Sequence, residues 1–416
     1  MISAGDPSRP IGRSVRFRPM TAPFQTGLFF LPSIGTRAEM ERGMAGRDPA
    51  LYQEMLGDLK ELAIVGDDLG YDAIAFTEHH FHIEGFEISN NPVLLDAYVA
   101  AHTKRIRVGQ LGIVLPASSP LRVAEDIAML DHMSGGRAFA GFARGYQRRW
   151  VDTLAQQYHD VHAAPSKSRD EEVDRVNRAA FEEFFTIVKL AWTQDTFSYT
   201  GQFWQIPPPD IPWDLEATAR MGRGAEGGFV REIGVVPKPL QQPHPPMMQP
   251  FSFSEPTIRW CARNGVQPIL APVNDELEAF LFSVYHEEAN TAGRNLAPGE
   301  GIGVLRDVVV ADTDEEAWEL WRNSGAFVGA AWFSPFGFGG AIPWPGEDPK
   351  SITPEVMHER GLMWVGSPAT VRRQVEQTLE RLPLKYVMAW QYNGLMPRAA
   401  IAKSMRLFQE EVVEKL

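Results

Sequence analysis

The chain has 416 residues, of which 44% are hydrophobic, and a formal net charge of −13. This length and composition suit one large domain with a sizeable core, and the acidic surface disfavours nucleic-acid partners. Cys261 is the single cysteine, which excludes an intrachain disulfide and a thiolate metal site. No apolar run reaches the roughly 18 residues that cross a bilayer, and residues 1–23 lack a secretory signal, so we expect a cytoplasmic protein without a membrane partner.

Residues 1–23 form an extension rich in Pro, Ser and Arg, after which short apolar runs alternate with amphipathic stretches. Continuous apolar runs predict strands buried on both faces, and apolar residues at helical spacing predict the helices between them. In the first half of the chain we expect strands at residues 26–31, 71–76, 106–115 and 138–143, and helices at residues 51–70, about 92–102, 120–137 and 173–192.

Residues 196–231 interrupt this alternation, because they are rich in Pro and Gly and carry Trp204 and Trp213. The alternation returns near Met247. Further strands are expected at residues 266–271, 303–310 and 386–390, and helices at residues 255–264 and 275–292, after 314, after 368, and at 398–414. Residues 324–349 follow the seventh strand and combine many glycines with large aromatic side chains, a composition that suits a lid.

About eight strand–helix units predict a parallel sheet. Eight units favour a closed (β/α)8 TIM barrel over an open doubly wound sheet, and no Gly-rich dinucleotide fingerprint follows the first strand. We therefore expect a single barrel domain over residues 24–416, with insertions at about 196–231 and 324–349.

Titratable residues gather where the second strand ends, at Glu78, His79 and His80. In such barrels the carboxyl ends of the strands carry the active site. A lone histidine is usually a satisfied core residue, but three titratable groups in a row at this edge favour function. A metal site is the first alternative. No HExxH helix or second histidine–carboxylate cluster occurs at a matching strand end, so we predict no metal.

Two further groups suit an anion on the same face of the barrel. Arg144 follows the fourth strand, and Ser254 precedes a helix whose first turn contains Thr257. Taken singly, these residues would be a surface salt bridge and a helix cap. Together, an arginine fork and the free N–H groups of a helix N-terminus suit a phosphorylated cofactor.

The stretch TEHHFHIEGFEISNNP, the block GIVLP…PLRVAEDIAMLD…SGGR and the RGY motif resemble the bacterial-luciferase-like, flavin-dependent monooxygenases. The resemblance is strong over residues 24–147, moderate over 247–310 and 362–414, and weak between. It implies a (β/α)8 barrel that binds FMN at its carboxyl face. It also implies that reduced FMN comes from a separate NAD(P)H:flavin reductase and forms a flavin 4a-hydroperoxide with oxygen.

The resemblance also assigns roles to residues. It implies that His79 lies beside the reactive edge of the flavin and Glu78 near its rings, and that a non-proline cis peptide joins Leu111 to Gly112, against which the rings rest. It further implies that the phosphate ligands are Arg144, Ser254 and Thr257, with Tyr146 and Phe253 as further cofactor-binding residues.

We therefore predict an FMN-dependent monooxygenase of a bulky, largely apolar organic substrate, and the resemblance implies a homodimer. The candidate substrate and lid residues are His80, Trp332, Phe333, Phe336 and Trp390, and Trp204 or Trp213 is expected to share their pocket. Two alternatives stay open: a deazaflavin-dependent oxidoreductase of the same superfamily, and a non-catalytic flavin-binding protein. A metal hydrolase on a barrel is a weaker alternative.

Overall fold

A computed structural model describes residues 22–158, 160–166, 170–392 and 394–416 of the protein. Most of the expected N-terminal extension, residues 1–21, lies outside the described residues. The described part begins just before Phe24, which is 2% exposed and packs in the core beside the first strand. In the part of the chain that the structure describes, no helix is long and apolar enough to cross a membrane.

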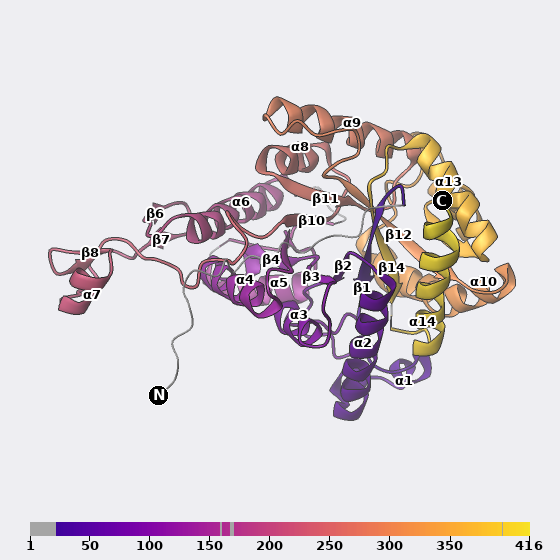
Figure 1. Cartoon of the computed structure of the whole chain (residues 1–416), viewed down its shortest axis with the longest axis horizontal. Helices are drawn as coiled ribbons and strands as arrows, with labels where there is room; N and C mark the ends of the chain where they lie inside the picture. The colour runs from indigo at the N-terminus through magenta and orange to yellow at the C-terminus, as the bar shows by residue number, and fades with distance from the viewer. Residues whose placement is uncertain (1–21, 159, 167–169, 393) are drawn as a thin grey trace, which may run out of the picture.

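Eight parallel strands close into a barrel (Figure 1). Each strand pairs with its neighbour in the order β1-β2-β3-β5-β10-β11-β12-β14, and β14 pairs again with β1. The predicted (β/α)8 barrel is thus confirmed. The strands are β1 (Gln25–Phe30), β2 (Ala73–Phe76), β3 (Arg107–Gln110), β5 (Ala138–Ala143), β10 (Met247–Ser252), β11 (Val266–Leu270), β12 (Gly303–Val310) and β14 (Tyr386–Tyr392).

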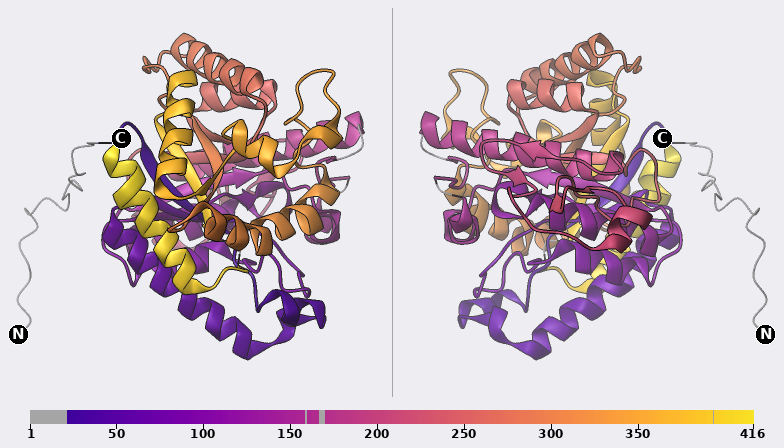
Figure 2. Two further views of the ribbon diagram at one scale, coloured as in Figure 1. Left: turned by 90° about the vertical axis from the view of Figure 1, so that its right-hand side faces the viewer. Right: turned by 90° about the vertical axis from the view of Figure 1, so that its left-hand side faces the viewer.

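Helices surround the strands (Figures 1 and 2), and many begin with Asp, Asn, Ser or Thr at the N-cap or Pro in the first turn. The longer ones are α2 (Pro49–Leu69), α3 (Pro92–Ala100), α4 (Pro120–Ser134), α6 (Glu171–Thr193), α8 (Glu255–Asn264), α9 (Asp275–Thr291), α10 (Asp314–Asn323), α13 (Pro368–Arg381) and α14 (Arg398–Leu407). The shorter ones are α1 (Arg37–Glu41), α5 (Arg148–Leu154), α7 (Glu216–Met221), α11 (Gly325–Val328) and α12 (Pro354–Glu359). The last long helix, α14, packs beside α2 (Figure 2). The first and last strand–helix units of the barrel are therefore neighbours.

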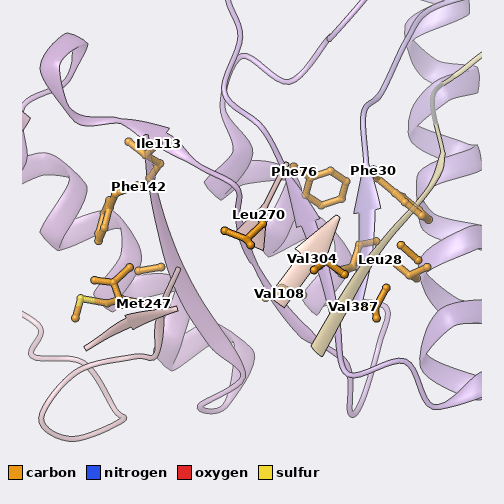
Figure 3. Packing of buried hydrophobic residues seen from close by; sticks show 14 of the residues in the cluster. Leu28, Phe30, Phe76, Val108, Ile113, Phe142, Met247, Leu270, Val304 and Val387 are labelled. Atoms are coloured by element: carbon orange, nitrogen blue, oxygen red, sulfur yellow. The ribbon is translucent and has the colours of Figure 1, made fainter. Parts of the chain in front are cut away.

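Alternate side chains of the strands form two apolar clusters. The larger cluster lies between strands and helices and includes Leu28, Phe30, Phe76, Val108 and Val304 (Figure 3). The second contains the residues that alternate with these, among them Phe29, Ala75, Met248, Ile269, Leu305 and Met388. In a closed barrel this second set points inward and fills the interior.

The structure departs from the expected strands at two places. The run 106–115 is one strand in the sequence prediction, but β3 ends at Gln110 and the chain forms β4 (Ile113–Val114), which pairs with the end of β5. The prediction also missed β13 (Met363–Gly366), which pairs with the second half of β12. Four apolar or glycine residues are too short a run to separate a strand from a loop by pattern alone.

The irregular stretch after α6 contains two small hairpins. They are built from β6 (Tyr199–Thr200) and β7 (Gln205–Ile206), and from β8 (Ala225–Glu226) and β9 (Phe229–Val230). Figure 1 shows the part around α7 and β8 projecting away from the barrel. This stretch is therefore an excursion from the βα alternation, and it adds no strand to the barrel.

Candidate active site at the carboxyl end of the barrel

The loop after β2 folds back on itself and buries His79. The backbone N–H of His79 donates to the carbonyl of Ser89 at 3.2 Å, and the hydroxyls of Thr77 and Ser89 are 3.2 Å apart. His79 is 7% exposed. Its ring lies 6.1 Å from the ring of Trp150, measured between centroids. The histidine predicted as catalytic is thus held inside the protein at the end of a barrel strand.

Glu78 connects the end of β2 to β4. One of its carboxylate oxygens accepts the backbone N–H of Val114 at 2.6 Å, and the other lies 3.0 Å from Nε2 of His80. The His80 ring lies 5.1 Å from that of Trp150. In the structure, Glu78 therefore links the loop after β2 to the start of β4 by hydrogen bonds. Its part in cofactor binding stays a prediction.

The peptide bond between Leu111 and Gly112 is cis, as the family resemblance implied. Leu111 is buried, and its N–H donates to the carbonyl of Phe76 at 2.7 Å, which holds this turn against the end of β2. A Cβ atom at Gly112 would lie 2.7 Å from the backbone of Gly141, so this position requires glycine. The turn is thus buried between the ends of β2 and β5, on the same side as Glu78.

Arg144 leaves β5 toward the N-terminal part of α6. Its Nε donates to Oδ1 of Asn177 at 2.9 Å, and its Nη2 donates to Oδ1 of Asp174 at 2.8 Å. Among the described residues, no hydrogen bond is made by Nη1. Burial, and then the nearby Arg178, lower the pKa of the Arg144 guanidinium. An anion at this place would offset both effects.

The N-terminus of α8 follows β10, the strand adjacent to β5, so it lies at the same end of the barrel as Arg144. Ser254 is the N-cap residue, as predicted, but its side chain makes no capping hydrogen bond, and its Oγ only accepts from Thr257 at 3.4 Å. Phe253 is 42% exposed at this edge. The first N–H groups of α8 therefore lack a side-chain partner, which is the donor set that a phosphate group needs.

A buried polar network that the sequence analysis did not predict extends from His79. The amide nitrogen of Gln147 donates to Oε2 of Glu87 at 2.8 Å and lies 3.4 Å from Nδ1 of His79, and its amide oxygen lies 2.7 Å from Nε2 of His82. Tyr146, a predicted cofactor-binding residue, accepts from the same amide nitrogen at 3.1 Å. The third histidine of the TEHHFHIEGFE stretch was the available signal, but its partners come from other elements.

Burial governs the protonation of this network. It lowers the pKa of His79 well below the ordinary value, with His82 and His80 as further causes. It raises the pKa of Glu87 to about 7, against the hydrogen bonds from Trp332 and Gln147. His79 is therefore neutral at physiological pH and can donate from one ring nitrogen and accept at the other.

Aromatic residues of the candidate lid lie over this network. Phe336 and Phe338 each make an edge contact with Tyr146, at ring-centroid distances of 5.1 and 4.9 Å. Phe333 meets Trp390, a predicted substrate residue on β14, at 5.6 Å. The segment is folded into α11 and short helical turns, and its partly buried side chains join the inner cluster of the barrel.

The two tryptophans of the excursion lie elsewhere, so the expectation that Trp204 or Trp213 shares this pocket is wrong. Trp204 packs on Tyr158 and Phe184, on the outer side of the barrel. Trp213 is 43% exposed and donates its N–H to Thr218. Hydrophobic character alone could not show which face of the barrel each tryptophan covers.

This face of the barrel fits a phosphorylated flavin. The uncapped α8 N-terminus and Nη1 of Arg144 would supply donors for a phosphate, and the Leu111–Gly112 turn, with no side chain at Gly112, would support a ring system. His79 lies near this turn through the shared β2 edge, and the aromatic segment limits access of water. When bound, a reduced flavin would supply the electrons for reaction with oxygen.

Comparison with known proteins agrees with this geometry. The luciferase-like monooxygenase family matches residues 36–385. The oxygenase component of the flavin-dependent trigonelline monooxygenase of Acinetobacter baylyi is 27% identical over 68% of this chain and 66% of its own. The 3,6-diketocamphane 1,6-monooxygenase of Pseudomonas putida is 26% identical over 76% of this chain and 81% of its own.

Two solved structures illustrate the range of this fold. The oxygenating constituent of Pseudomonas putida 3,6-diketocamphane monooxygenase, solved with FMN, has a TM-score of 0.71 and 21% identity over 95% of this chain and 99% of its own. A coenzyme F420-dependent reductase of Methanopyrus kandleri has a TM-score of 0.58 and 16% identity over 94% of this chain and 98% of its own. At these identities they establish the fold alone. The family match over most of the chain decides the class: the protein belongs to the luciferase-like monooxygenase family and is a flavin-dependent monooxygenase.

Proposed function

We propose that the protein is the oxygenase of a two-component system. It takes reduced FMN from a separate NAD(P)H:flavin reductase and uses oxygen, through a flavin 4a-hydroperoxide, to oxygenate a bulky, largely apolar organic substrate. The observation that carries this proposal is that Arg144 and the uncapped N-terminus of α8 follow adjacent strands, β5 and β10, at the end of the barrel that also carries the buried His79.

The phosphate cradle supports FMN as the cofactor, because an arginine fork and free helix N–H groups complement a dianion. The two monooxygenase relatives support it as well, since one is named an oxygenase component and the solved structure of the other contains FMN. A deazaflavin cofactor is the second candidate, which the likeness to the F420-dependent reductase keeps in view.

The chain's own residues would orient the cofactor and protect it. Arg144, Ser254 and Thr257 would bind the phosphate, and the Leu111–Gly112 turn would support the rings. Neutral His79 would hold or transfer a proton at the reactive edge. Phe333, Phe336 and Trp390 favour an apolar substrate, because these partly buried aromatic side chains gather with Tyr146 over the carboxyl end of the barrel.

We also propose a homodimer in the cytoplasm. Large apolar side chains on the surface of α3 and α4 support association: Leu94 is 66% exposed, Met129 is 51% exposed and Met133 is 65% exposed. Such residues on neighbouring helices form the kind of surface that a second copy covers.

The proposal is tested by anaerobic calorimetric titration with three reduced ligands: FMN, riboflavin and a deazaflavin. We expect reduced FMN to bind at one site per chain and riboflavin, which lacks the phosphate, to bind more weakly. Preferential binding of the deazaflavin would replace the proposed activity by hydride transfer. Binding of none of the three would contradict a flavin site at this face.

A further inference from the structure

Glu87 is a buried carboxylate that touches residues from three parts of the chain. Its Oε2 accepts the indole N–H of Trp332 at 2.6 Å and the amide N–H of Gln147 at 2.8 Å. Its Oε1 makes no hydrogen bond and lies 3.2 Å from Nε2 of His79. Glu87 is 1% exposed, and a carboxylate so far from water is costly unless its partners compensate for the lost solvent. Packing alone does not account for a charge at this position.

The hydrogen bonds around His79 decide which nitrogen carries its proton. An ionised carboxylate can only accept, and Oε1 of Glu87 lies 3.2 Å from Nε2 of His79, whereas Nδ1 lies 3.4 Å from the amide nitrogen of Gln147. The proton of the neutral ring is therefore on Nε2, the nitrogen that faces the unpaired Oε1 of Glu87. This arrangement leaves His79 in a single tautomer for as long as Glu87 and Gln147 keep their places.

The same carboxylate holds the aromatic segment. The indole of Trp332 stacks on Phe86 with centroids 4.9 Å apart and rings 28° from parallel, and it meets the edge of His82 at 5.1 Å. Phe86 and His82 belong to the loop that carries Glu87. Trp332 is thus seated on this loop by two ring contacts and one hydrogen bond, and the hydrogen bond alone depends on the carboxylate.

We propose that Glu87 is a positioning residue that couples closure of residues 324–349 to the proton on His79. Oε2 accepts from Trp332, and Oε1 faces Nε2 of His79 at 3.2 Å, so a change at either partner alters the same carboxylate. The inference rests on the proposed function only for the role of His79, which is to hold or transfer a proton at the flavin. The contacts of Glu87 stand without it.

Titratable groups surround Glu87 from two sides. Its own loop contributes His79, His82 and Glu84, and the chain after β5 contributes Tyr146 and Arg149, while the aromatic segment contributes only the neutral indole. Both ring nitrogens of His82 face oxygen atoms, those of Phe86 at 3.0 Å and Gln147 at 2.7 Å. Nδ1 of His82 also lies 3.3 Å from Oε2 of Glu87, so this ring is a second neighbour of the same carboxylate.

A bound metal ion is the competing explanation of this cluster. His79, His82 and Glu87 offer one ligand atom each within 4.8 Å of one another. Burial, however, lowers the pKa of His82 to about 4, and each nitrogen of its neutral ring already has an oxygen neighbour, the carbonyl of Phe86 or the amide of Gln147, which a metal ion would have to displace. We therefore assign the cluster to proton placement and make zinc binding an outcome of the test.

The test is a pH titration of the flavin-free protein labelled with ¹⁵N-histidine, followed by NMR from pH 5 to 9. Wild type should show neutral His79 with its proton on Nε2 and one cluster titration near the pKa of Glu87, about 7. Glu87→Gln should abolish that titration. Because an amide has one acceptor oxygen, it should also lose either the His79 or the Trp332 contact.

Trp332→Phe is the second variant, and it keeps the ring stack while removing the N–H donor. We expect the cluster to titrate at higher pH, because that donor stabilises the carboxylate. Proteolysis within residues 324–349 should become about fivefold faster, as loss of one hydrogen bond predicts. Phe333→Leu is the matched control, because it loosens the same segment without touching Glu87: cleavage should quicken while the titration is unchanged.

Three results would overturn the proposal. His79 signals and a cluster titration identical to wild type in both Glu87→Gln and Trp332→Phe would separate the segment from the histidine. If Phe333→Leu shifted the cluster titration as much as Trp332→Phe does, the coupling would be a general effect of loosening residues 324–349. Stoichiometric zinc in wild type that is lost in Glu87→Gln would make the cluster a metal site. If wild type with reduced FMN formed no oxygenated flavin, the proposed function would fail. The titration would still test the role of Glu87, because it is measured on the flavin-free protein.

Discussion

Arg144 is the residue whose role can be isolated best, because FMN and riboflavin differ by the phosphate that it is proposed to bind. We expect Arg144→Ala to weaken FMN binding by about 2 kcal/mol, roughly 30-fold, in the range for truncating one member of a buried charge pair. Riboflavin affinity should barely change. Arg148→Ala, at an exposed neighbour paired with Asp152, serves as the control in the same calorimetric titration. Equal losses for both ligands would place Arg144 outside the phosphate site.

His79→Ala tests the proposed proton-handling residue. We expect the variant to fold and bind FMN but to release hydrogen peroxide in place of product, because no buried imidazole then holds a proton at the reactive edge. The measurement is peroxide formed per NAD(P)H consumed with a reductase present, with the exposed His102→Ala as control. Normal coupling in His79→Ala would contradict a catalytic role.

At the residue scale the sequence indicated part of the site and missed the rest. Glu78, His79 and Arg144 could be placed because each directly follows a recognisable strand. The cis bond at Leu111 came from the family resemblance and from no pattern of spacing. Glu87 could not be predicted, because its burial depends on Trp332, which is 245 positions away in the chain.

At the scale of elements, the segment 324–349 is predicted to protect the site. Residues 330–346 can be replaced by a short Gly-Ser linker, which keeps the buried Gly325 and Val328 of α11. The barrel should stay folded, because this segment contributes no strand to the sheet. Peroxide release should rise, because water reaches the cofactor. A linker variant that couples as well as the parent would show that the segment is only a surface loop.

Asp307 on β12 gives an element-scale prediction about pH. It accepts the indole N–H of Trp321 on α10, its other oxygen lacks a hydrogen bond, and burial raises its pKa to about 7. A raised pKa means that the folded state holds the proton more tightly. The stability that this proton contributes is therefore complete below about pH 4 and lost as the pH rises through about 7.

Asp307→Asn removes this titration while an amide oxygen can still accept from Trp321. Relative to wild type, the variant should gain about 2 kcal/mol of unfolding free energy between pH 5 and pH 8. Urea unfolding at the two pH values measures this difference, with the exposed Asp312→Asn as control. No difference between the two pH values would mean that Asp307 titrates in the ordinary range.

Element prediction succeeded where burial on both faces leaves a clear pattern. Seven of the eight barrel strands were expected at or near their observed positions, and the eighth, β10, begins at Met247, where the alternation was expected to return. The two errors share a cause, which is that apolar character does not show where a strand begins or ends. β3 ends at a backbone turn inside an apolar run, and β13 is a short strand beside β12. Trp204 and Trp213 show the same limit, since apolar character does not reveal which element a side chain packs against.

At the scale of the whole molecule, the proposed homodimer makes a separate prediction. Light scattering should give twice the mass of one chain. Met133→Glu on α4 should lower the measured mass to that of a single chain, because burying a carboxylate without a partner in the interface disfavours association. Met221→Glu is the control, because Met221 is 73% exposed on α7, in the excursion away from the barrel. A monomeric wild type, or a dimer indifferent to Met133→Glu, would contradict this interface.

The central claim, that this barrel face holds reduced FMN and directs its reaction with oxygen, is tested most directly by stopped-flow mixing. The anaerobic complex of the protein with reduced FMN is mixed with oxygenated buffer, and the flavin absorbance is followed in time. The account predicts an oxygenated-flavin absorbance band that outlasts the oxidation of free reduced FMN, with a shorter lifetime in His79→Ala. Direct oxidation to FMN at the rate of the free flavin, with no such band, would contradict it.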